Sequence, residues 1–97
     1  MRIISKKPLV DYWKKNPAAK AELEAWYAEA TEADWAKPVD VKAKYGNASI
    51  LQDGRVVFNI CGNKYRLVVR INYDYRIIYI RFLGTHKEYD KIDAQTV

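Results

Sequence analysis

The stretch RVVFNICGNKYRLVVRINYDYRIIYIRF, residues 55–82, alternates apolar and polar side chains with a period of two. This alternation is typical of β-strands that bury one face. Within the stretch, Gly62-Asn63 has the composition of a two-residue hairpin loop, with glycine first as a type II′ turn requires. A hairpin around that loop predicts three cross-strand pairs that are all apolar: Ile60 with Tyr65, Phe58 with Leu67, and Val56 with Val69.

A second hairpin is predicted around Asp74-Tyr75, where it would pair Ile71 with Ile78, Val69 with Ile80, and Leu67 with Phe82. A shift of one residue in either hairpin would mix the two faces of the sheet. The pattern therefore favours a three-stranded antiparallel meander with one apolar face. The opposite face would then carry three rows: Asn59, Arg66 and Leu83; Val57, Val68 and Arg81; and Arg55, Arg70 and Tyr79, with Lys64 at the edge near Arg66.

The residues before position 50 have helical spacing. Ser5 is predicted to cap a helix in KKPLVDYWKKN (6–16), and Asn16 to cap a second helix, PAAKAELEAWYAEA (17–30). Segment 39–46 is predicted to be a short helix that ends at Gly46, and segment 2–5 can form a short opening strand. The apolar side chains of the second helix lie on one face: Ala19, Leu23, Trp26 and Ala30.

A sheet with one apolar face needs one covering layer. We therefore expect an α+β fold in which two or three N-terminal helices pack on one face of a small twisted antiparallel sheet. The arginine-bearing face is expected to be open. A short C-terminal helix is predicted to follow, because Thr85 and Glu88 have the spacing of a capping box.

The overall composition suits one domain, 1–97, with one modest core, because the chain has 97 residues and 49% of them are hydrophobic. The single cysteine, Cys61, excludes an internal disulfide and a Cys-rich zinc site, and it fits a reducing compartment. No stretch is apolar enough for a signal peptide or a membrane span. We expect a cytoplasmic protein that contacts no membrane.

The positive charge lies mainly in the strand region. The segment 54–83 contains six basic residues and one acidic residue, Asp74. Its net charge of +5 equals the formal net charge of the whole chain. Arginine binds phosphate through two donors at once, so an arginine-rich sheet suggests an anionic partner such as nucleic acid. The alternative is a charged face that serves solubility. On the nucleic-acid interpretation, the RNA contacts of this face are Arg55, Asn59, Lys64 and Arg70.

The segment GTHKEYDKID (84–93) follows the last strand and holds the only histidine, His86. It would lie at the end of the sheet beside Arg66, which places an imidazole and the Tyr89 phenol among cations. RNA cleavage without a metal needs a base for the ribose 2′-hydroxyl, cations for the phosphate and an acid for the leaving oxygen. His86 could serve as acid or base, and Tyr89 as its partner or as an orienting or stacking group. Arg66 and Arg81 would hold the phosphate.

Simpler readings remain open for these residues. A histidine after a strand can be a plain surface or capping residue, and Glu88 and Asp90 can serve the start of the helix. Cys61 could act as a nucleophile, but no histidine pairs with it in the predicted register. No cluster of carboxylates or histidines suggests a metal site, so we expect no metal and no cofactor.

The segments FNICGNKYRLVVRINY (58–73) and IYIRFLGTHKEYDKIDA (78–94) together resemble the HigB family of type II toxin–antitoxin systems. The segment ADWAKPVDVKAKYGNAS (33–49) is also similar to the middle of that family. The resemblance implies a RelE/ParE-like fold and a ribosome-dependent mRNA endonuclease, an mRNA interferase. It implies that Arg66, Arg81, His86 and Tyr89 are catalytic and that Lys87 joins the RNA-contacting residues.

The resemblance also implies the partners. These are mRNA in the A site of the 70S ribosome and a HigA-type helix-turn-helix antitoxin, with operator DNA bound only through the antitoxin complex. Three alternatives stay open: a non-cleaving module that binds RNA, the ribosome or a protein; a gyrase-poisoning toxin on the same fold; and a degenerate, inactive toxin.

Overall fold

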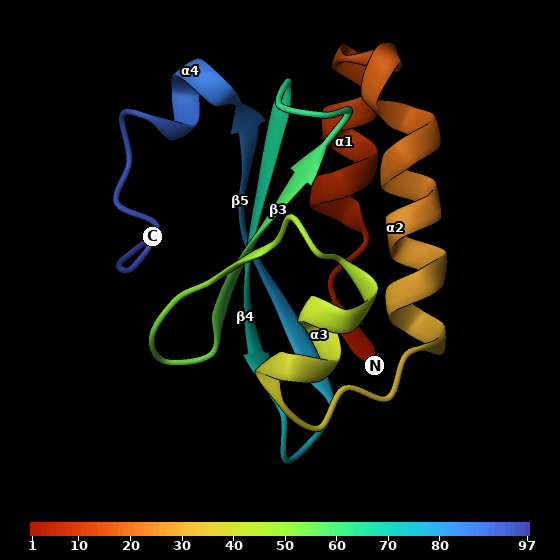
Figure 1. The fold of residues 1–97 in the computed structure, drawn as a ribbon. Coiled ribbons are helices and arrows are strands. Elements are labelled where there is room, and N and C mark those ends of the chain that lie inside the picture. The colour runs from red at the N-terminus through yellow and green to blue at the C-terminus, as the bar shows by residue number, and fades with distance from the viewer.

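Five strands form one sheet in the order β1-β5-β4-β3-β2 (Figure 1). The structure is a computed structural model that describes residues 1–97. Its strands are β1 (Arg2–Ile4), β2 (Ser49–Ile50), β3 (Arg55–Ile60), β4 (Tyr65–Asn72) and β5 (Ile77–Thr85). Its helices are α1 (Lys7–Lys15), a 3-10 turn η1 (Pro17–Ala19), α2 (Lys20–Glu32), α3 (Pro38–Lys44) and α4 (His86–Tyr89).

The central meander of β3, β4 and β5 is confirmed, and its first hairpin has the predicted register throughout. In the loop, both Cys61 and Gly62 have positive φ, 54° and 66°, and the Lys64 amide donates to the Cys61 carbonyl at 3.2 Å. The opening strand β1 runs parallel to β5, whereas β2 pairs antiparallel with β3. The complete sheet is therefore mixed and not purely antiparallel.

The second hairpin matches the prediction only up to Ile80. Ile71 pairs with Ile78 and Val69 with Ile80, but a β-bulge follows, and Val68 pairs with Phe82. Arg81 is the extra residue, without a partner on β4. The predicted pairing of Phe82 with Leu67 is therefore wrong: Leu67 pairs with Leu83. The predicted rows change accordingly, with Phe82 beside Val68 and Gly84 beside Arg66.

The helices cover one face of the sheet, as predicted. Figure 1 shows α1 and α2 on the side opposite α4 and the C-terminal end. The main core joins the apolar face of α2 to the apolar side of β3 and β4, and Trp26 packs against Phe58 with ring centroids 5.3 Å apart. The predicted inward side chains of α2 are all buried: Ala19, Leu23, Trp26 and Ala30.

The helix ends differ in detail from the prediction. Ser5 is not the cap of α1, because the N-cap is Lys6. Asn16 begins the turn η1 without a side-chain cap, and its amide donates back to the Tyr12 carbonyl at 3.2 Å. Helix α3 ends at Lys44 with Tyr45 as its C-cap, before Gly46. No helix is both long enough and apolar enough to cross a membrane.

The second face of the sheet is partly covered, contrary to the prediction of an open face. The C-terminal segment, residues 90–97, lies across its middle, and Ala94 packs with Val57 and Val68 in a small second cluster. Phe82 joins this cluster because the bulge has turned it to this face. The segment divides the face into two exposed parts, one at each end of the strands.

Candidate functional site

The first exposed part is a corner where α4 meets the end of β4. Asn59, Arg66 and Gly84 are paired across the three central strands, so Arg66 lies directly beside the turn into α4. The His86 backbone amide donates to the Lys64 carbonyl at 3.0 Å, which ties the first residue of α4 to the end of β4. The structure thus brings Lys64, Arg66 and His86 together, as the sequence predicts.

Helix α4 is held in place by the predicted capping box. The Thr85 hydroxyl accepts from the Glu88 amide at 3.1 Å, and the Glu88 carboxylate accepts from the Thr85 amide at 2.8 Å. The bond from the Thr85 amide is the main reason why the pKa of Glu88 lies below its ordinary value. Because both bonds span the first turn of α4, they fix the backbone at His86, which begins that turn.

His86 has a partner of its own. Its Nδ1 lies 3.3 Å from Asp90 Oδ2, one helical turn later. The Asp90 carboxylate therefore lies on the Nδ1 side of the imidazole ring, and Nε2 is the ring nitrogen on the other side. The His86 side chain is 51% exposed, so Nε2 is accessible to an external group. Asp90, which the sequence suggests only as a helix-start residue, therefore orients the histidine.

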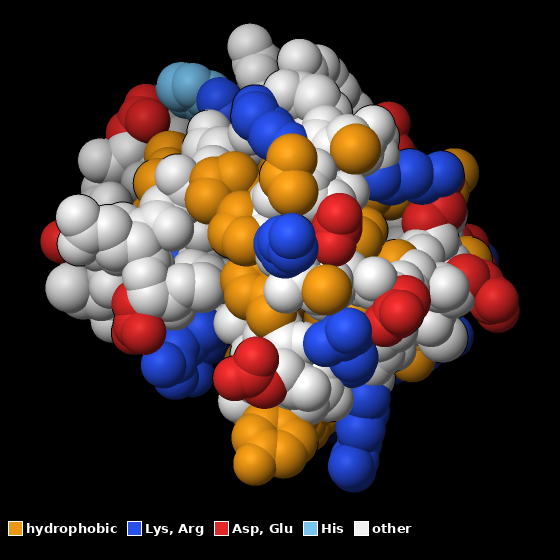
Figure 2. Space-filling view, turned by 60° about the horizontal axis from the view of Figure 1, so that its bottom comes forward, with side chains coloured by type: hydrophobic (Ala, Val, Ile, Leu, Met, Phe, Trp, Pro, Cys, Tyr) orange, Lys and Arg blue, Asp and Glu red, His pale blue; other side chains and the backbone are white.

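Arg66 and Tyr89 also contact each other. The Arg66 guanidinium lies over the Tyr89 ring, 5.7 Å from its centroid, and one of its Nη groups donates to the Asn63 carbonyl at 3.2 Å. The Tyr89 ring is half-buried against the second cluster. These contacts hold the arginine and leave its other donors available. Lys87 and Lys64 are exposed at the same corner, where Figure 2 shows the histidine next to Lys and Arg side chains.

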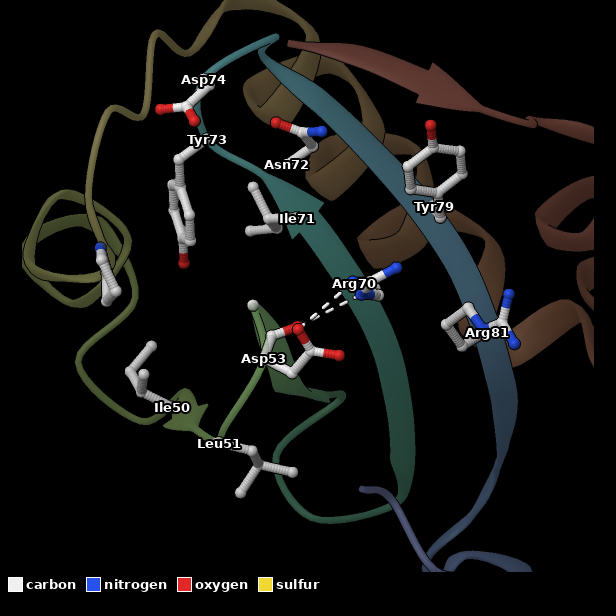
Figure 3. A pocket seen from close by; sticks show the side chains of 12 residues that line it. Ile50, Leu51, Asp53, Arg70, Ile71, Asn72, Tyr73, Asp74, Tyr79 and Arg81 are labelled. Carbon is white, nitrogen blue, oxygen red and sulfur yellow. Dashed lines mark hydrogen bonds and ion pairs between the residues drawn. The ribbon is translucent and has the colours of Figure 1, made fainter. Parts of the chain in front are cut away.

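The second exposed part is a hollow of about 560 Å³ at the other end of the strands (Figure 3). Arg70, Tyr79 and Arg81 come to it from β4 and β5. Arg70 binds Asp53, with Nη2 3.2 Å from Oδ1 and Nε 3.2 Å from the backbone carbonyl. Arg81, the extra residue of the bulge, donates through Nε to the Val97 backbone oxygen at 3.2 Å. Arg70 and Arg81 thus both line the hollow, whereas Arg66 and His86 lie at the corner.

Arg55 does not lie on an open face, and the prediction that it is available to RNA is corrected. Its side chain is only 8% exposed beneath the C-terminal segment, where it donates to the Ala94 and Val97 backbone oxygens. Asn59 keeps its predicted side of the sheet, but its amide donates to the Asn47 carbonyl at 3.2 Å. Both side chains are therefore engaged within the protein.

Two carboxylates in these parts are not among the residues predicted from the sequence. Asp90 could have been found from its spacing, since it is four residues after His86 in a predicted helix. Asp53 has no such signal, because its pairing with Arg70 depends on the β2–β3 turn. Cys61 gains no role: its pKa is raised, chiefly by burial, which keeps the thiol protonated.

Comparisons with known proteins show similar sequences over nearly the whole chain. The family model described as "HigB_toxin, RelE-like toxic component of a toxin-antitoxin system" matches residues 19–92. The chain is 35% identical over 96 residues to the mRNA interferase toxin HigB of Escherichia coli strain K12, covering 97% of this chain and 92% of that protein. It is 27% identical over 94 residues to the mRNA interferase HigB of Escherichia coli O6:H1, covering 95% and 91%.

Proposed function

Because the chain belongs to the HigB family of RelE-like toxins of toxin–antitoxin systems, we propose that it is an mRNA interferase, an endoribonuclease that cuts mRNA on the ribosome. The observation that carries this proposal is the corner itself. An oriented histidine, a phenol and an arginine with free donors meet at the end of the sheet, beside two exposed lysines. These are the groups that phosphodiester cleavage by the ribose 2′-hydroxyl requires.

The chemical step proceeds by internal attack. The base takes the proton of the 2′-hydroxyl, the 2′-oxygen forms a bond to the adjacent phosphorus, and the bond from phosphorus to the 5′-oxygen breaks. The acid gives a proton to that leaving 5′-oxygen, so the products are a cyclic phosphate and a free 5′-hydroxyl. Each proton transfer typically contributes ~10²–10⁴-fold to the rate.

His86 performs one of the two proton transfers, through Nε2, because its Nδ1 faces the Asp90 carboxylate. Tyr89 is the second proton-transfer group or the surface against which a base stacks. Arg66 binds the phosphate as negative charge develops on it, with Lys64 and Lys87 adding positive charge nearby. The second-face residues Arg70 and Arg81 bind RNA outside this corner.

The ribosome supplies the substrate geometry. The corner is exposed and has no deep pocket of its own. The ribosome therefore holds the RNA in the conformation that aligns the 2′-hydroxyl with the phosphorus. The mRNA is cut in the A site of the ribosome, which places the protein in the cytoplasm. A HigA-type helix-turn-helix antitoxin neutralises it, and the complex binds operator DNA through the antitoxin.

The test is expression of the toxin in growing cells. The intact chain should stop translation and create new 5′ ends within translated messages, read by primer extension. Arg66→Ala and His86→Ala should each remove both effects. Arg2→Ala is the matched control, because Arg2 is exposed on β1 and pairs with Ile77 at the opposite end of the sheet.

Circular dichroism and thermal unfolding would establish that both corner variants stay folded. If folded Arg66→Ala and His86→Ala remain fully toxic, the corner is not the active site. Growth arrest without new 5′ ends would instead indicate a module that binds and does not cut.

A further inference from the structure

The hollow contains an arginine, Arg70, that already forms an ion pair with an aspartate of the same protein, Asp53. Arg70 contacts Asp53 twice, through Nη2 to the carboxylate and through Nε to the backbone carbonyl. Figure 3 shows the Asp53 side chain directed at the Arg70 guanidinium within the hollow. A carboxylate at a guanidinium is in the position that a phosphate oxygen would take, since both anions accept from the same donors.

Two other side chains that line the hollow suit a nucleotide unit. Arg81 brings a second guanidinium from the neighbouring strand, and Tyr79 brings an aromatic ring. The volume of about 560 Å³ is in the range of small-molecule sites. Two arginines and two aspartates, Asp53 and Asp74, line the hollow, so its formal charge is balanced while Asp53 stays in place.

Asp53 can leave Arg70 without a change in the fold. The backbone of the turn is fixed, because the Gly54 carbonyl accepts from the Ile71 amide at 2.8 Å. The Asp53 side chain, in contrast, is 69% exposed and has Arg70 as its only ion-pair partner. Rotation of this side chain alone exposes Nη2, while the bond from Nε to the Asp53 carbonyl continues to orient the guanidinium.

We propose that the hollow is a second phosphate-binding site for the RNA strand, which Asp53 occupies in the free protein. A backbone phosphate displaces the Asp53 carboxylate from Arg70 and is shared with Arg81, while Tyr79 contacts the attached nucleoside. Asp53 therefore weakens RNA binding at this site by the cost of replacing one exposed ion pair. This inference rests on the proposed function, because it assumes that RNA crosses this face.

The spacing of the two sites fits one strand. Arg66 and Arg70 are four residues apart on β4, which is about 13 Å at ~3.3 Å per residue. That distance equals the rise of about four stacked nucleotides at 3.4 Å each. The hollow would therefore hold a phosphate a few nucleotides from the one that is cut.

The experiment measures binding without cleavage. A fluorescent 2′-O-methyl decanucleotide lacks the attacking hydroxyl, and its affinity for the purified protein is read by fluorescence anisotropy at low salt. Asp53→Asn should bind about two- to five-fold more tightly than the intact chain, as expected when one exposed ion pair no longer competes. Arg70→Met should bind more weakly, and adding Asp53→Asn to Arg70→Met should bring no gain.

Two control variants make the same change in net charge. Asp74→Asn removes a carboxylate from the same hollow, and Glu32→Gln removes one from the exposed surface of α2. Both should leave affinity within about 1.5-fold, because neither carboxylate pairs with Arg70. The inference is overturned if Asp74→Asn tightens binding equally, if Asp53→Asn still gains without Arg70, or if no variant binds the RNA. The toxicity test of Arg66 and His86 is independent of these outcomes.

Discussion

Replacing Gly54 by alanine is expected to destabilise the protein much more than the same replacement at Gly62 or Gly46. Gly54 lies in the turn between β2 and β3 with φ at 74°. A Cβ added there would lie 2.4 Å from the Ile71 carbonyl oxygen, whereas real Cβ contacts are essentially never under 3.0 Å. The Gly54 carbonyl also binds the Ile71 amide, so relief of the contact would strain that bond.

The other two glycines separate the cost of a left-handed backbone from the steric cost of the added Cβ. Gly62 has φ at 66°, but an added Cβ meets nothing within 4 Å, so alanine there carries only the cost of a left-handed backbone, about 1–2 kcal/mol. Gly46 has neither a positive φ nor a close neighbour, and alanine there should be neutral or stabilise by up to about 1 kcal/mol. At Gly54 the backbone cost is joined by overpacking of about 1–3 kcal/mol, which gives a total of about 2–5 kcal/mol.

Urea unfolding followed by tryptophan fluorescence measures these differences, because Trp13, Trp26 and Trp35 are all buried in the main core. The denaturant slope should stay constant across the series, so that shifts of the midpoint report the free energy of unfolding. An unfolding free energy for Gly54→Ala within about 0.5 kcal/mol of that for Gly62→Ala would refute the reasoning. It would mean that the turn and β4 do not approach as closely as the structure shows.

Three further predictions test the rest of the fold. Arg55→Met keeps a side chain of similar length but removes the donors that bind residues 90–97, so amide hydrogen exchange in that segment should become faster while that of α2 stays unchanged. The pKa of Glu88 is lowered mainly by the Thr85 amide, so its stabilisation is complete above its ordinary pKa and is lost as pH falls. Chemical unfolding between about pH 5 and pH 3 should therefore show a steeper loss for the intact chain than for Glu88→Gln. Trp26→Ala, at a side chain only 1% exposed, should lower the free energy of unfolding by about 3–5 kcal/mol in a urea titration.

The register of the first hairpin could be predicted because its information is local. Alternation specifies which side chains of β3 and β4 are buried, and Gly62-Asn63 specifies where the chain reverses. The capping box of α4 depends on residues three apart in the chain, and it was predicted for the same reason. The buried face of α2 follows from helical periodicity alone.

The β-bulge at Arg81 could not be predicted, because Phe82 and Leu83 are both apolar and either one can face the helices. The choice depends on the second cluster, in which Phe82 meets Ala94 from the C-terminal segment. The bulge leaves Arg81 without a partner on β4, and its side chain lines the hollow. The same segment buries Arg55, which alternation alone had placed on an open face.

The candidate corner was predictable, since Arg66, His86 and Tyr89 lie close to the end of a strand and the start of a helix. The orientation of His86 by Asp90 and the occupation of Arg70 by Asp53 were not, because each needs side-chain geometry. Periodicity and turn chemistry act between residues near in the chain, so they define strands, faces and one hairpin register. Which face stays exposed, and which cations are free, is decided by segments far apart in sequence that compete for the same surface.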